Sequence, residues 1–130
     1  MEDIKNKEDV KIFVNAFYEK VQSDELLGPI FASRIQDKEW PIHLERMYSF
    51  WNTVLFGQID YRGNPFSKHA KLPIFATHFK RWINLMNVTI DDCFEGEKAG
   101  EVKLRAERMG NIFQAKLKYI RDNDQYINLV

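Results

Sequence analysis

The chain has 130 residues, which is the size of a single domain with one core. Its 19 basic and 19 acidic side chains cancel, and this balance argues against a nucleic acid or an anionic membrane as partner. No apolar run approaches the roughly 18 residues of a membrane span, and the charged amino terminus MEDIKNKEDV does not have the pattern of a secretory signal.

The single cysteine, Cys93, excludes an internal disulfide and is interpreted as a packing residue. A chain of this composition suits a reducing cytoplasm. We therefore predict one cytoplasmic domain over residues 1–130, with no internal repeat and no second unit.

Apolar residues recur at helical spacing in four places, and no convincing strand alternation accompanies them. This pattern predicts an all-α fold. The first helix is expected over about residues 7–22, with one apolar face formed by Val10, Phe13, Val14, Phe17 and Val21.

The segment ELLGPIF is then expected to turn at Gly28 and Pro29, because proline lacks the donor that a helix interior needs and glycine permits a helix stop. A second helix is predicted to open near Asp37, with Pro41 in its first turn, and to end at Gly57. Residues 57–66, GQIDYRGNPF, have the composition of a loop between apolar helices, and such loops are often functional.

Two longer helices complete the predicted fold. One is expected from about Phe75 to Phe94, where Gly96 breaks it, and its apolar face contains Phe79, Trp82 and Met86. The last is expected over about residues 97–122. Its apolar residues alternate between spacings of four and three, as in an amphipathic helix.

The motifs for a phosphate loop, a Cys-X-X-Cys pair, a zinc protease and a serine hydrolase are all absent from this sequence. Candidate chemistry therefore rests on three histidines. His78 lies near a predicted helix start and is interpreted as a surface or capping residue. His43 falls on the buried side of its helix, and either Tyr18 or Trp82 could face it there, although each could equally bond a backbone carbonyl.

His69 lies between a Gly-Asn-Pro turn and Pro73, on a short segment near the core. One histidine without a cluster of acidic residues provides too few ligands for a zinc or di-iron site. A haem needs only one axial imidazole, an apolar slot and a few donors on the opposite face. We therefore expect His69 as the proximal ligand of a haem, with Tyr18, His43 and Trp82 on the distal side.

Several short blocks along the chain carry a resemblance to a known family. They are FYEKV with LGPIF, W-x-x-H followed by FW, KHAKLPIF, HFKRW, and RAERM before IFQAKL. In this order and spacing the chain resembles a truncated haemoglobin, the two-over-two helical globin family, and most of all its group III. The paired-glycine motifs of groups I and II are absent, as in group III.

The resemblance implies roles for individual residues. His69 would be the proximal iron ligand, and Tyr18, His43 and Trp82 would be distal donors. Met47 falls at the apolar distal position one turn beyond His43, where a branched aliphatic residue is expected.

The remaining residues of the implied haem pocket lie around these positions. Phe31 resembles the residue at the porphyrin edge and Trp51 one that closes the distal side, while Arg46 occupies a position that often reaches a haem propionate. Lys68, Lys71 or Arg62 could take the place of Arg46. Leu72 and Phe75, beside His69, complete the expected pocket.

The function implied is the binding of O₂, NO and CO at a pentacoordinate iron of haem b, in a monomer. The same pocket could support peroxidase-like or NO dioxygenase chemistry, which would need an external reductase because the sequence has no flavin or nicotinamide motif. A haem-free helical interaction or sensor domain, with the aromatic residues as core, is the alternative from another class.

Overall fold

The computed structural model describes residues 1–58 and 74–129, with side chains as far as residue 123. Its described part is helical, without strands, which confirms the predicted all-α fold. In chain order the elements are α1 (Lys7–Ser23), α2 (Gly28–Arg34), the 3₁₀ helix η1 (Asp37–Glu39), α3 (Trp40–Phe56), α4 (Ala76–Cys93) and α5 (Glu97–Leu129).

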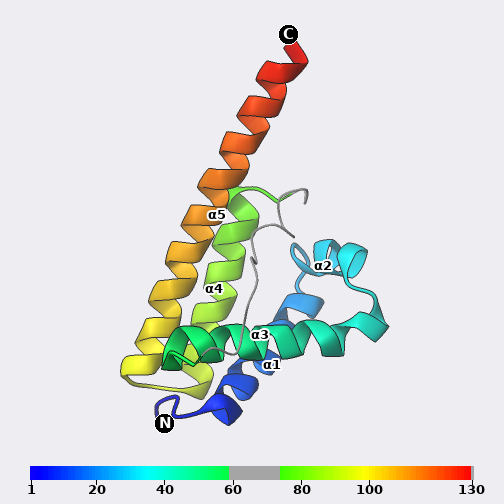
Figure 1. Cartoon of the computed structure of the whole chain (residues 1–130). Coiled ribbons are helices and arrows are strands. Elements are labelled where there is room, and N and C mark those ends of the chain that lie inside the picture. The colour runs from blue at the N-terminus through cyan, green and yellow to red at the C-terminus, as the bar shows by residue number, and fades with distance from the viewer. Residues whose placement is uncertain (59–73, 130) are drawn as a thin grey trace.

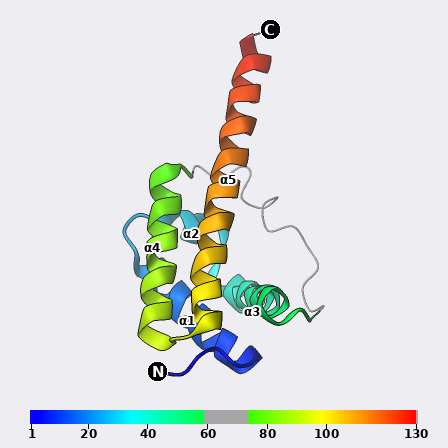
Figure 2. The same cartoon turned by 90° about the vertical axis from the view of Figure 1, so that its left-hand side faces the viewer.

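The long helices form two pairs that pack on each other. Helices α4 and α5 lie side by side, and α1 packs against both α3 and α4 (Figure 1). A view turned by 90° shows α3 end-on, so α3 crosses the direction of the α4–α5 pair (Figure 2). The arrangement is therefore two helices over two.

Helix α1 buries the apolar face that the sequence predicts. Val10, Phe13 and Val21 are fully buried. The residues that recur with the 3.6-residue period of the helix therefore face the core. The helix begins after Asn6, whose side chain accepts a hydrogen bond from the Asp9 N–H at 3.1 Å. It ends at Ser23, as expected.

The segment after α1 differs from the prediction. We expected Gly28 and Pro29 to form only a turn, but the structure begins a helix there, α2, that runs to Arg34. The physical reason is that proline lacks only a backbone donor, and the first turn of a helix has no use for that donor. The same exception applies to Pro41, in the first turn of α3.

The boundaries of the other helices follow the sequence closely, with one difference. Helix α3 ends at Phe56, and Gly57 after it adopts the left-handed backbone with φ of 68°. Helix α5 continues to Leu129, beyond the expected end near Asp122, because neither glycine nor proline follows Asp122 to stop it. Its last turns extend away from the other helices (Figure 1).

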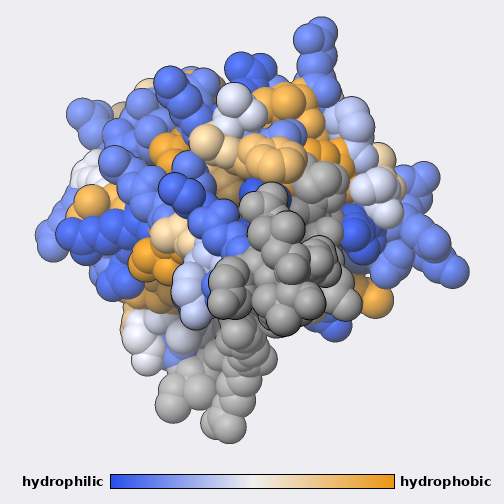
Figure 3. Space-filling view, turned by 90° about the horizontal axis from the view of Figure 1, so that it is seen from above, coloured by the Kyte–Doolittle hydropathy of each residue, from blue (hydrophilic) through white to orange (hydrophobic). Residues whose placement is uncertain are grey.

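The main core lies between α1, α3, α4 and α5, and a smaller cluster contains Ile74, Phe79 and Leu117. Cys93 is half-buried at the end of α4. Seen from above, the described surface is largely polar, and apolar residues reach it in separate groups (Figure 3). Among the described helices, none combines the length and the low polarity that crossing a membrane requires.

Candidate ligand-binding pocket

An apolar cavity lies between the α1–α2 corner and the α4–α5 pair. Its volume is about 80 Å³. The lining comes from α1, α2, α4 and α5, from Leu27 just before α2 and from Ile74 two residues before α4: Tyr18, Leu27, Ile30, Phe31, Ile74, His78, Phe79, Trp82, Met109, Gly110 and Phe113. Most of these side chains are aliphatic or aromatic. A hydrogen-bond donor among them therefore has few other polar groups beside it that could also bond a ligand.

Tyr18, on α1, is the most enclosed polar side chain of the lining, with 7% of its surface exposed. Its ring makes edge contacts with the rings of Phe17 at 4.9 Å, Trp40 at 5.8 Å and Phe31 at 6.1 Å. Burial raises the pKa of the phenol well above its ordinary value, because ionisation would place a charge in an apolar site. Tyr18 is therefore a neutral phenol that can donate a hydrogen bond.

His43, on α3, lies directly beside Tyr18. The two ring centroids are 5.0 Å apart and the planes are nearly perpendicular, and a second edge contact joins His43 to Trp40 at 5.6 Å. The Nε2 atom of His43 is buried. Of the two residues that the sequence proposed to face His43, the structure places Tyr18 there.

Trp82, on α4, lines the same cavity as Tyr18. Its ring meets Phe17 edge-on at 5.7 Å, and the side chain packs half-buried on the main core. Phe31, from α2, also lines the cavity and stacks on Trp40 at 6.3 Å. Tyr18, Trp82 and Phe31, which are far apart in the sequence, therefore share one pocket.

Other predicted pocket residues lie outside the lining of this cavity. Met47 is half-buried on the core, one turn beyond His43, and Trp51 is 3% exposed with an edge contact to Phe13 at 5.7 Å. Arg46 is exposed on α3. Phe75 is 53% exposed, and the guanidinium of Arg121 lies 4.1 Å from its ring.

The predicted iron ligand His69 lies outside the described residues, as do Lys68, Leu72, Lys71 and Arg62. Their assignment stays a prediction from the sequence. Within the described ranges, no three His, Cys, Asp or Glu side chains come together as a metal site.

His78 is the lining residue whose role the sequence only partly anticipated. Its Nδ1 accepts a hydrogen bond from the Phe75 N–H at 3.0 Å, which confirms the capping role at the start of α4. The ring also lines the cavity. The sequence did not indicate this second position of His78, nor the place of Leu27 and Ile30 in the lining.

Comparison with known proteins identifies the family. The model for the bacterial-like globins matches residues 1–114. This chain belongs to the bacterial-like globin family. The globin is 35% identical over 115 residues to the Group 3 truncated hemoglobin ctb of Campylobacter jejuni subsp. jejuni serotype O:2 (strain ATCC 700819 / NCTC 11168), across 86% of this chain and 91% of that protein.

A solved structure confirms the fold of this globin. The crystal structure of the group III truncated hemoglobin from Campylobacter jejuni matches it with a TM-score of 0.81 and 34% identity, over 90% of this chain and 95% of that one. The resemblance to group III truncated haemoglobins and the predicted two-over-two fold are both confirmed.

Membership of the globin family implies that the chain is a haem-binding protein. The lining of the cavity fits this group in chemistry, because aromatic and aliphatic side chains suit a porphyrin and the phenol and indole supply donors. The cavity volume of about 80 Å³ is small beside the roughly 300–1,000 Å³ of typical cofactor sites. The cavity lining is therefore only part of the surface that a haem would contact.

Proposed function

We propose that this globin holds haem b through His69 and binds O₂, NO and CO, with Tyr18, Trp82 and His43 on the distal side. When bound, the haem supplies an iron with an open coordination position for such diatomic ligands. Tyr18 and Trp82 then serve as hydrogen-bond donors to the ligand, and His43 supports the orientation of Tyr18.

The observation that carries this proposal is the pairing of two donors in an apolar cavity. The hydroxyl of Tyr18 and the indole N–H of Trp82 belong to side chains that line the same cavity from α1 and α4. The rest of the lining is mostly apolar, so few other polar groups there compete for a hydrogen bond to a ligand. His43 and Trp40 flank Tyr18 and restrict its ring.

The remaining pocket residues are proposed to have supporting roles. Phe31, Trp51 and Met47 would contribute apolar contacts, together with Leu72 and Phe75, while Arg46 or Lys68 would pair with a haem propionate. We place this monomer in the cytoplasm. Turnover of peroxide or NO would need electrons from an external reductase, so ligand binding is the function that we propose.

The test is the absorption spectrum of purified protein supplied with haem. We expect a Soret band in the wild type and its loss or strong reduction in His69→Ala, because the substitution removes the proposed axial ligand. His78→Ala is the matched control, since His78 lines the cavity but its Nδ1 is engaged by the Phe75 N–H. That variant should retain the band.

Two outcomes would contradict the proposal. Wild-type protein without a Soret band would favour the haem-free interaction or sensor domain instead. A band that survives His69→Ala but disappears in His78→Ala would overturn the assignment of the ligand.

A further inference from the structure

A buried carboxylate, Asp24, organises the corner between α1 and α2. The residue is 8% exposed. Its Oδ2 accepts hydrogen bonds from the backbone N–H groups of Leu27 at 2.9 Å and Leu26 at 3.1 Å. Its own backbone carbonyl accepts from the Gly28 N–H at 2.9 Å. The start of α2 is therefore oriented by this single residue.

The other carboxylate oxygen of Asp24 joins this corner to α4. Arg81 donates to Oδ1 from Nε at 2.7 Å and from Nη2 at 2.6 Å. The two residues are 57 positions apart in the sequence. The Asp24 side chain is 3% exposed. It links the end of α1, the start of α2 and α4 through charge-assisted hydrogen bonds.

The residues next to this ion pair are residues of the cavity wall. Leu27, which donates to Asp24, lines the cavity, and Phe31 follows one turn later on α2. On the other side, Arg81 directly precedes Trp82. The pair therefore connects the two walls that carry the pocket's aromatic side chains.

We propose that Asp24 and Arg81 are positioning residues for the distal side of the haem pocket. They hold α2 and α4 at the spacing that sets Phe31 against Tyr18 and places Trp82 opposite them, and so they control how long a diatomic ligand stays bound. This inference rests on the proposed function. Neither residue lines the cavity itself.

Other contacts hold α1 and α4 together without this pair. The rings of Phe17 and Trp82 meet at 5.7 Å, and Phe17 is 1% exposed in the main core. Loss of the ion pair should therefore leave the helices folded and packed while α2 gains freedom to shift. The position of Phe31 against Tyr18, at 6.1 Å, is what such a shift changes.

The experiment uses full-length, haem-loaded Asp24→Asn, Arg81→Gln and Arg81→Lys. Asparagine retains an acceptor for the N–H groups of Leu26 and Leu27, and lysine retains the charge but not the two-donor geometry. The control is Arg105→Gln, which removes an exposed ion pair to Glu101 within α5 at 3.0 Å. Readouts are the O₂ dissociation rate, the infrared C–O stretching band of the CO complex, and the urea unfolding midpoint.

We expect O₂ dissociation to change by roughly two- to thirtyfold in Arg81→Gln, the range for residues that act on a site without touching its ligand. The C–O band should shift or broaden, and Arg81→Lys should recover only part of the change. In a Tyr18→Phe background the same substitution should have a smaller effect than in the wild type, because the part of its effect that acts through the Tyr18 hydroxyl is already lost. Arg105→Gln should match the wild type.

A lower unfolding midpoint with unchanged O₂ dissociation and an unchanged C–O band would overturn the proposal and leave the pair a structural contact only. If Asp24→Asn does not fold, the two Arg81 variants decide. A wild type without a Soret band would instead refute the haem assignment, so the two failures are distinguishable.

Discussion

The phenol of Tyr18 is a case in which the surroundings decide what a side chain can do. An exposed tyrosine ionises near its ordinary pKa of about 10. Here enclosure by Phe17, Phe31, Trp40 and His43 raises the pKa, because an apolar site disfavours the phenolate. The hydroxyl therefore remains a donor throughout the neutral pH range.

Substitution of the two donors tests their role toward a bound ligand. In haem-loaded Tyr18→Phe and Trp82→Leu, O₂ should dissociate faster, by about ten- to 150-fold, if one hydrogen bond to a charged group worth roughly 1.5–3 kcal/mol is lost. Stopped-flow measurement of O₂ release gives the rates.

Tyr48→Phe is the control for these two variants. Tyr48 is a second buried tyrosine, on α3, but its hydroxyl donates to Asn15 and its ring does not line the cavity. Its O₂ dissociation rate should equal that of the wild type. Unchanged rates in both Tyr18→Phe and Trp82→Leu would remove these residues from the distal side.

At the level of elements, α2 shows how a seven-residue helix can be held in place by its neighbours. So short a helix is not stable alone. Gly28 begins it at a close approach to α1, where a Cβ atom would lie 2.7 Å from the backbone oxygen of Gln22. A backbone atom cannot move aside as a flexible side chain can, so Gly28 is required by this packing.

Gly28→Ala should therefore destabilise the protein despite the better helix propensity of alanine. We expect a loss of about 1–3 kcal/mol in the free energy of unfolding, the usual cost of forcing an extra carbon into a packed site. Gly100→Ala is the control, because a Cβ atom there meets nothing within 4 Å in helix α5. That variant should be stabilised by about 0.4–1 kcal/mol in urea unfolding. Equal effects of the two substitutions would refute the packing argument.

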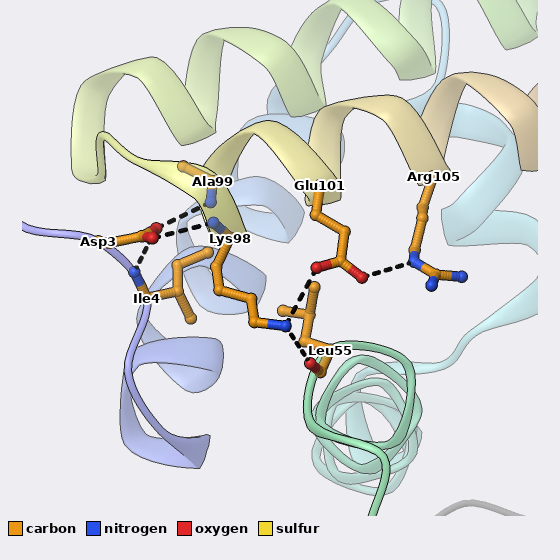
Figure 4. Close-up of polar contacts among 7 residues, drawn as sticks. All are labelled: Asp3, Ile4, Leu55, Lys98, Ala99, Glu101 and Arg105. Atoms are coloured by element: carbon orange, nitrogen blue, oxygen red, sulfur yellow. Dashed lines mark hydrogen bonds and ion pairs between the residues drawn. The ribbon is translucent and has the colours of Figure 1, made fainter.

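At the scale of the whole molecule, the amino-terminal segment is tied to α5 and α3 through one polar network (Figure 4). Asp3 accepts hydrogen bonds from the backbone N–H groups of Lys98 and Ala99, both at 2.9 Å, and so caps the start of α5. The ammonium of Lys98 donates to the carbonyl of Leu55 at 2.6 Å, near the end of α3. Segments more than 40 residues apart in the sequence are joined by these bonds.

Asp3→Ala should weaken this connection and lower the free energy of unfolding by about 1 kcal/mol at pH 7, as for other lost helix caps. Burial raises the pKa of Asp3, but hydrogen bonds from Lys98, Ala99, Ile4 and Glu97 outweigh it and hold the pKa below its ordinary value. The contribution is therefore complete above the unfolded pKa of about 3.9 and is lost as pH falls through the folded pKa.

Urea unfolding of wild type and Asp3→Ala between pH 7 and pH 2 measures this dependence. The difference between them should be constant near neutrality and shrink below about pH 4. Glu2→Gln, at an exposed neighbouring carboxylate that pairs with Lys5, should not change stability measurably at pH 7. A difference that grows as pH falls would contradict the assignment.

Much of the architecture could be predicted locally. The 3.6-residue spacing of Val10, Phe13 and Val21 identifies the buried face of α1, and Gly57 marks the end of α3, because periodicity and backbone freedom are properties of neighbouring residues. The sequence also carries the resemblance to group III truncated haemoglobins, which the comparisons confirm. It names His69 as the iron ligand, and this stays a prediction.

Only the tertiary structure decided which residues meet across the chain. It brought Tyr18 against His43, set Trp82 in the same cavity as Phe31, and made α2 a helix rather than a turn. It also paired Asp24 with Arg81, although nothing in the spacing of two charged residues 57 positions apart indicates contact. The physical reason is that helix formation depends on nearby residues, whereas a pocket depends on how packed helices bring distant side chains together.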